Sequence, residues 1–123
     1  MQFSGIEISA ILKLAKAMAL ADGKIEKVEI AVITREILRF GVEPEQLETF
    51  LAAGDAMEPA HAMAIISGLD KKQKKYVAAY LGTIMASDMD INDKEMALWQ
   101  LVSTLCELPT MNVQQAVQIM ADL

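Results

Sequence analysis

Two short polar segments carry the side chains of this sequence that could do chemistry. In each of them, carboxylates cluster between two stretches with helical spacing. Carboxylate oxygens are the hard ligands that calcium and magnesium prefer, whereas zinc prefers histidine and cysteine. We therefore predict a divalent-cation site, for calcium or magnesium, formed by acidic side chains of the two segments. Its candidate ligands are Asp22 and Glu29 in the first segment and Asp88, Asp90, Asp93 and Glu95 in the second.

An internal repeat relates the two acidic segments. When the sequence is slid by 66 positions, residues 22–31 align with residues 88–97. Each half then has an aspartate at the end of one helix, an isoleucine in the turn and a glutamate in the first turn of the next helix. The match fades beyond about Trp99, and it predicts a pseudo-twofold repeat of two helical halves. The identical pairs are Asp22/Asp88, Ile25/Ile91, Glu29/Glu95 and Ala31/Ala97.

The second acidic segment is not an EF-hand loop. Asp88, Asp90 and Asn92 occupy the first, third and fifth ligand positions of such a loop. However, Asp93 stands at the sixth position, where glycine is required, and Trp99 stands at the twelfth, where glutamate is required. Any cation site here must therefore have another geometry.

The same carboxylates also have a purely structural interpretation. Asn92 and Glu95 have the spacing of a capping box, in which two side chains satisfy the free amides of a helix start. The helix dipole also favours acidic residues at this position. On this interpretation the acidic segments cap helices and bind no ion, and the sequence leaves both interpretations open.

The composition predicts an all-α fold. Hydrophobic residues make up 54% of the chain but aromatic residues only 5%, with nine methionines. The abundant Ala, Leu and Met are good helix formers. At 123 residues we expect one domain spanning 1–123, built as a compact bundle of about seven helices with short connections. The expected helices are 6–21, 27–40, 44–53, 59–68, 71–87, 93–106 and 112–123.

Glycine, proline and apolar spacing set these limits. Gly23 and Gly41 follow the first two helices, and Pro44 and Pro59 begin the next two. Asp70 is the expected N-cap of the fifth helix. Apolar spacing places Ile30, Ile33 and Ile37 on the inner face of the second helix, with Glu36 outside, and a stripe of Met96, Leu98, Leu101, Val102 and Leu105 inside the sixth.

No catalytic arrangement can be assembled from this sequence, so we expect a protein that is not an enzyme. His61 and Cys106 are the single histidine and cysteine, and no glycine-rich phosphate loop is present. One cysteine cannot form an internal disulfide, which fits a reducing cytoplasm. Neither a secretory signal nor an apolar stretch long enough to span a membrane is found, so a cytoplasmic location is expected.

The charge distribution limits the partners. A formal net charge of −6 repels nucleic-acid phosphate, so no nucleic acid is expected to bind. The four lysines of residues 71–75 sit at a helix start, where the dipole disfavours them. They form either a solvated face or a docking face for an acidic partner or for lipid headgroups, which would allow peripheral membrane contact. A protein partner and a homo-oligomer both stay open.

At the two turns the sequence resembles the TerB-like family, the tellurite-resistance protein B group. The resemblance rests on residues 17–25 with Glu29, and on residues 85–91 with Glu95. It implies an all-helical fold with a pseudo-twofold and a divalent cation held by acidic residues, here Asp22 and Glu29 and then Asp88 and Glu95. It also implies a role in bacterial stress response or as a scaffold near the membrane. The sequence departs from the pattern at Met89, where the first half has glycine.

Overall fold

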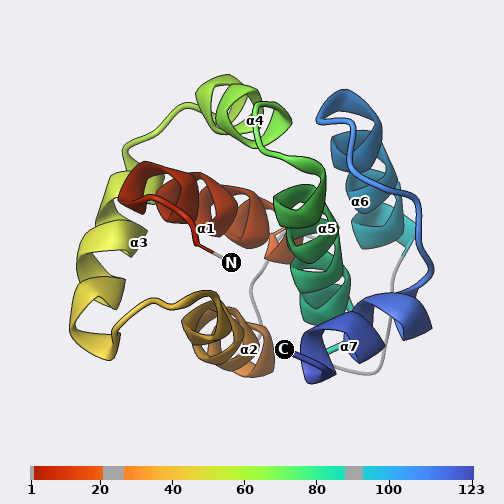
Figure 1. Ribbon diagram of the computed structural model, residues 1–123, viewed down its shortest axis with the longest axis horizontal. Coiled ribbons are helices and arrows are strands. Elements are labelled where there is room, and N and C mark those ends of the chain that lie inside the picture. Colours follow the sequence, from red (N-terminus) through yellow and green to blue (C-terminus); the bar gives the residue numbers. More distant parts are fainter. Residues whose placement is uncertain (1, 21–26, 88–92) are drawn as a thin grey trace.

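Seven α-helices and two short 3₁₀ turns make up the computed structural model (Figure 1), which describes residues 2–20, 27–87 and 93–123. No strand occurs in these ranges, and the predicted all-α class is confirmed. The helices are α1 (Gly5–Ala19), α2 (Lys27–Ile37), α3 (Leu47–Asp55), α4 (Pro59–Ser67), α5 (Lys71–Met85), α6 (Asp93–Leu105) and α7 (Val113–Ala121), with 3₁₀ turns at Leu38–Phe40 and Pro44–Gln46.

Local signals end most helices within two residues of the expected limits. Ser4, Asp70 and Asn112 cap α1, α5 and α7, each in a reciprocal capping box with the residue three positions later. Gly41 has a φ of 86° and ends the 3₁₀ turn that follows α2, as expected of a glycine at this position. The segment from Pro44 differs, because it opens with a 3₁₀ turn before α3 begins.

The first three helices and the last three repeat at the same shift of 66 positions as the sequence. α5 begins and ends 66 positions after α1, α7 does so after α3, and α6 begins 66 positions after α2. The caps repeat as well, since Ser4 and Asp70 occupy equivalent positions. The repeat in helix order thus continues well past Trp99, where the identity of the two halves fades.

α1 and α5 form the centre of the bundle. The two helices cross in the middle of Figure 1, with α3 along one edge and α6 and α7 on the other side. α3 packs against α1 as α7 packs against α5, and α2 and α6 each contact both central helices. Their fully buried side chains include Ile11, Leu12, Met18, Val77, Leu81 and Ile84.

Two buried hydrogen bonds hold α2 and α6 against α5. The Tyr80 hydroxyl donates to the Ile33 carbonyl over 2.7 Å, and the Trp99 indole Nε1–H donates to the Ala78 carbonyl over 3.2 Å. Tyr80 also lies against the Phe40 ring, with the centroids 5.5 Å apart. The two large polar aromatics therefore have their polar atoms satisfied inside the core.

The structure corrects four predicted side-chain positions. Ile30, Leu101 and Leu105 were expected to be buried but are about half exposed, at 48%, 53% and 57%. α6 instead buries Trp99 and Val102, so its inner face is rotated away from the predicted stripe. Glu36 was expected outside but is only 6% exposed, and its buried carboxylate is compensated by a pair with Arg39 in the 3₁₀ turn that follows α2.

Two glycines permit close helix contacts. A Cβ atom at Gly82 of α5 would lie 2.6 Å from the Ala116 Cβ of α7 and 2.8 Å from the Trp99 ring. A Cβ at Gly54 of α3 would lie 2.7 Å from the Ser9 carbonyl oxygen of α1. Each half thus has one glycine where its first and third helices approach each other most closely.

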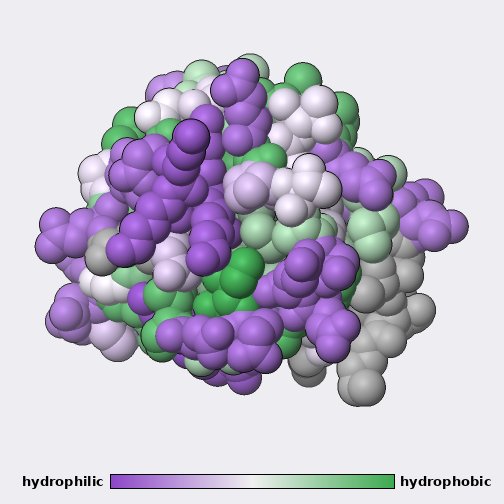
Figure 2. Space-filling view, turned by 45° about the vertical axis from the view of Figure 1, so that its right-hand side comes forward, coloured by the Kyte–Doolittle hydropathy of each residue, from purple (hydrophilic) through white to green (hydrophobic). Residues whose placement is uncertain are grey.

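The surface is mainly hydrophilic, as Figure 2 shows for the face turned toward α5, α6 and α7, with apolar patches between the polar side chains. Within the described ranges, no helix combines the length and apolar character needed to cross a membrane.

Gly82→Ala should destabilise the protein by about 1–3 kcal/mol, because the added methyl group overpacks the contact with α7. The matched control is Gly68→Ala, whose Cβ would meet only a carbonyl oxygen at an ordinary 3.5 Å. Urea unfolding followed by Trp99 fluorescence measures both. Equal unfolding midpoints for the two variants would show that the close approach is not needed.

The protein should lose stability in alkaline solution through Tyr80. Burial, and then the nearby Glu36 carboxylate, raise the pKa of Tyr80 well above the ordinary tyrosine value of 10.0. The unfolded chain releases this proton first, so the stabilisation is complete below about pH 10 and is lost as the pH rises further. The melting temperature should fall less steeply above about pH 10 in Tyr80→Phe than in the wild type or in Tyr76→Phe. Parallel curves for all three proteins would contradict this assignment.

Candidate functional site

Glu29 and Glu95 are the two predicted ligands that the structure places in the interior. They lie in the first turns of α2 and α6, at equivalent positions of the repeat, and each is 1% exposed. Both make polar interactions within the protein. Burying a carboxylate costs free energy unless hydrogen bonds or a positive charge compensate for it. Both halves therefore bury a carboxylate at the same place, each with polar interactions inside the protein.

Of the other four predicted ligands, the structure describes only Asp93. Asp93 begins α6 and is exposed, and the helix dipole stabilises its negative charge at this position. Asp22, Asp88 and Asp90 lie outside the described residues. Of the six predicted ligands, the structure therefore places one buried carboxylate in each half.

A complete metal site is not formed by residues 2–20, 27–87 and 93–123 alone. Within these ranges, no three His, Cys, Asp or Glu side chains come close enough together to hold an ion. Calcium takes six to eight oxygen ligands, and magnesium takes six. Glu29 and Glu95 have the right donor chemistry, so a site at either position requires further oxygens, from other residues or from water.

Besides Glu95, Ser87 is another polar side chain beside the second acidic segment. Its hydroxyl oxygen is buried and forms no hydrogen bond with the described part of the chain. The backbone amide of Ser87 donates to the Ile84 carbonyl as the chain leaves α5. Sequence reasoning did not single out this serine, because a hydroxyl next to a helix end has no distinctive spacing.

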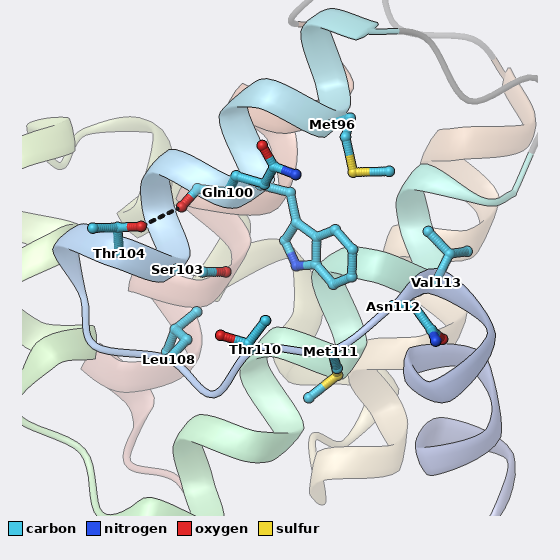
Figure 3. Close-up of a pocket in the computed structure, with 10 residues that line it drawn as sticks. Met96, Gln100, Ser103, Thr104, Leu108, Thr110, Met111, Asn112 and Val113 are labelled. Atoms are coloured by element: carbon cyan, nitrogen blue, oxygen red, sulfur yellow. Dashed lines mark hydrogen bonds between the residues drawn. The ribbon is translucent and has the colours of Figure 1, made fainter.

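A groove of about 490 Å³ lies between α6 and the segment that leads into α7 (Figure 3). Met96 and Met111 border it from opposite sides, and Ser103 and Thr104 lie on its α6 side. The Thr104 hydroxyl is already used, since it donates to the Gln100 carbonyl over 2.9 Å. No charged or titratable side chain lines this groove, so it can take an apolar group but offers no acid–base chemistry.

Cys106 has the environment of a structural thiol. It is fully buried, and its Sγ lies 3.6 Å from the Met63 carbonyl oxygen. Burial raises the pKa of the Cys106 thiol, although the Lys74 charge opposes the shift. The thiolate is the nucleophile, so the restricted access to the buried sulfur and its raised pKa both make this cysteine unreactive.

The comparisons with known proteins agree with the fold and assign no activity. No model of a known protein family matches the chain, and no curated protein matches it. Among solved structures, it is similar to a protein of unknown function, PG1108 from Porphyromonas gingivalis W83. The two are 55% identical with a TM-score of 0.91, over 98% of this chain and 92% of that one. The chain therefore belongs to the same family as PG1108, and the TerB-like resemblance stays a prediction.

Cys106 should react slowly with a thiol-specific reagent in the folded protein. Burial and a raised pKa both lower the amount of accessible thiolate at neutral pH, so we expect a rate at least about tenfold below that of the unfolded chain. Absorbance with a chromogenic disulfide reagent, with and without guanidinium, measures the ratio. Similar rates in the two conditions would contradict the buried position of the thiol.

Proposed function

We propose that this chain is a non-enzymatic, TerB-like helical module that binds a divalent cation, calcium or magnesium, beside the first turns of α2 and α6. The observation that supports the proposal is the burial of Glu29 and Glu95 at equivalent positions of the two halves. A buried carboxylate that recurs in both halves has a shared purpose, and a hard cation is one ligand that stabilises it.

The second half is the better candidate for the site. Glu95 would supply the buried oxygen and Asp93 a water-facing one, with Asp88 and Asp90 completing the predicted set. The first half has only Asp22 beside Glu29 in that set, so it would bind more weakly. Fewer carboxylates lower the affinity of a calcium site.

Cation binding would give this module a regulatory role. An ion reduces the repulsion between neighbouring carboxylates and so favours one arrangement of the helix starts. A protein contact near α2 or α6 would then depend on the ion. The TerB-like resemblance suggests that such a contact serves a bacterial stress response or a scaffold near the membrane.

A second candidate function is an interaction module without an ion. Leu101 and Leu105 are exposed four residues apart on α6, which makes a small apolar strip on the helix surface. A second copy of the chain would cover this strip in a homodimer, and Glu29 and Glu95 would then only stabilise the helix starts. Light scattering with and without Leu101→Ser and Leu105→Ser tests this alternative.

A thermal melt in calcium, magnesium or zinc tests the cation proposal. A cation present at roughly a hundredfold excess over its dissociation constant adds about 2.7 kcal/mol to the stability. For a chain of this size, the melting temperature should rise by about 10 °C. Calcium or magnesium should produce this rise in the wild type, and Glu95→Gln should lose most of it.

The matched control is Glu48→Gln, which removes an exposed glutamate from the first turn of α3 and should leave the rise unchanged. Each variant is first melted in a chelator, so that any loss of basal stability is separated from loss of the cation effect. The absence of a rise with either cation in the wild type would reject the proposed site. A rise in Glu95→Gln and Glu29→Gln as large as that of the wild type would also reject it.

A further inference from the structure

Each half of the molecule has a groove between its first and third helices. One groove lies between α1 and α3, beside α4, and the other lies between α5 and α7. Four positions that line the first groove line the second at the shift of 66 residues. These pairs are Gly5/Lys71, Ser9/Lys75, Thr49/Gln115 and Ala53/Ile119.

The two grooves differ in charge. The α1–α3 groove is lined by Gly5 and Ser9 where the α5–α7 groove has Lys71 and Lys75. No carboxylate lines the α5–α7 groove, although the chain has a net charge of −6. The second groove is therefore a local cationic site on an acidic protein.

Both groove lysines are available to a ligand. Lys71 and Lys75 are exposed, and neither forms a salt bridge with the described residues. Lys74 differs, because it lies toward the interior and is 3.9 Å from the Glu107 carboxylate. The Lys75 ammonium lies 5.7 Å from the centre of the Tyr76 ring, which holds it near the helix surface.

Apart from the lysines, the α5–α7 groove is lined by three apolar residues and by the uncharged polar residues Thr110, Gln115 and Gln118. Pro109, Met111 and Ile119 line it, and its volume is about 590 Å³. A lysine rim over an apolar floor matches a ligand that carries carboxylates next to large apolar side chains. We propose that the α5–α7 groove is a docking site for an acidic, apolar peptide segment of a partner protein.

The shape and charge favour a peptide over a membrane. A lipid surface is flat and anionic, so it would meet the net negative charge of the whole molecule as well as the lysines. A peptide segment enters the groove and meets only the charges on its rim. Met111 in the floor adds an adaptable apolar contact, as methionines do at peptide-binding surfaces.

A second copy of the chain fits the groove less well. Residues 43–58 contain five carboxylates with no lysine or arginine, so they are the acidic stretch most complementary to the groove. They include α3, which lies at the opposite edge of the molecule from α7 (Figure 1). Such a contact would be heterologous, so it would join copies head to tail into rings or open chains and not into a simple dimer.

Fluorescence anisotropy with a labelled peptide, Glu-Asp-Leu-Phe-Glu-Leu, tests the proposal. The wild type should bind it, and the Lys71→Gln, Lys75→Gln double variant should bind about five- to tenfold more weakly, since two partly exposed ion pairs are lost. Lys72→Gln is the matched control, because Lys72 is exposed on the same helix but does not line the groove. The double variant should fold, because the helix dipole disfavours positive charge at a helix start and removing that charge is favourable for α5.

Two further peptides separate charge from apolar contact. Gln-Asn-Leu-Phe-Gln-Leu and Glu-Asp-Ser-Ser-Glu-Ser should each bind more weakly than the acidic, apolar peptide. Equal binding of the acidic, apolar peptide Glu-Asp-Leu-Phe-Glu-Leu by wild type and double variant would overturn the proposal. The proposal would also be overturned if the protein bound no peptide but sedimented with phosphatidylserine vesicles in a lysine-dependent way. Self-association of the wild type in light scattering, abolished in the double variant, would overturn it as well.

Discussion

A carboxylate buried at the start of α2 and again at the start of α6 is the constraint on which this account depends. Glu29 and Glu95 are almost fully enclosed, and an ionised group in such a place must have its charge compensated. The compensation has to be local, because both residues lie in the first turns of their helices, just after a polar segment of the chain. Whatever stabilises them also sets how α2 and α6 leave the central helices.

The central helices make this constraint effective. α1 and α5 are held to the rest of the bundle by close contacts, with Gly54 and Gly82 at the tightest points. The Tyr80 and Trp99 hydrogen bonds then fasten α2 and α6 to α5. Away from the buried glutamates, α2 and α6 are fixed to the core. An ion bound at either glutamate would therefore change the surfaces of both helices.

Much of the fold could be predicted from local signals. Ser4, Asp70 and Pro59 set helix starts through side-chain caps and a missing amide, which need no knowledge of the tertiary fold. The inner face of α6 could not be predicted in this way. Several apolar residues lie around that helix, and the choice of Trp99 over Leu101 depends on the space that Gly82 leaves on α5.

The candidate site was predictable only in part, for a similar reason. The repeat of Glu29 in Glu95 marked the two residues from identity alone, and the structure buries both of them. Glu36 carried no such mark, and its burial depends on the pairing with Arg39. The equivalence of α3 and α7 was invisible in the sequence, because helix position is retained while side chains such as Thr49 and Gln115 have diverged.

Nuclear magnetic resonance with added Mn²⁺, a paramagnetic substitute for magnesium, tests the central claim most directly. The account predicts that low Mn²⁺ first broadens the amide signals of Glu95 and Glu29, at the starts of α6 and α2, and that excess magnesium restores them. Broadening centred instead on the exposed carboxylates of residues 43–58, or no broadening at either helix start, would contradict it.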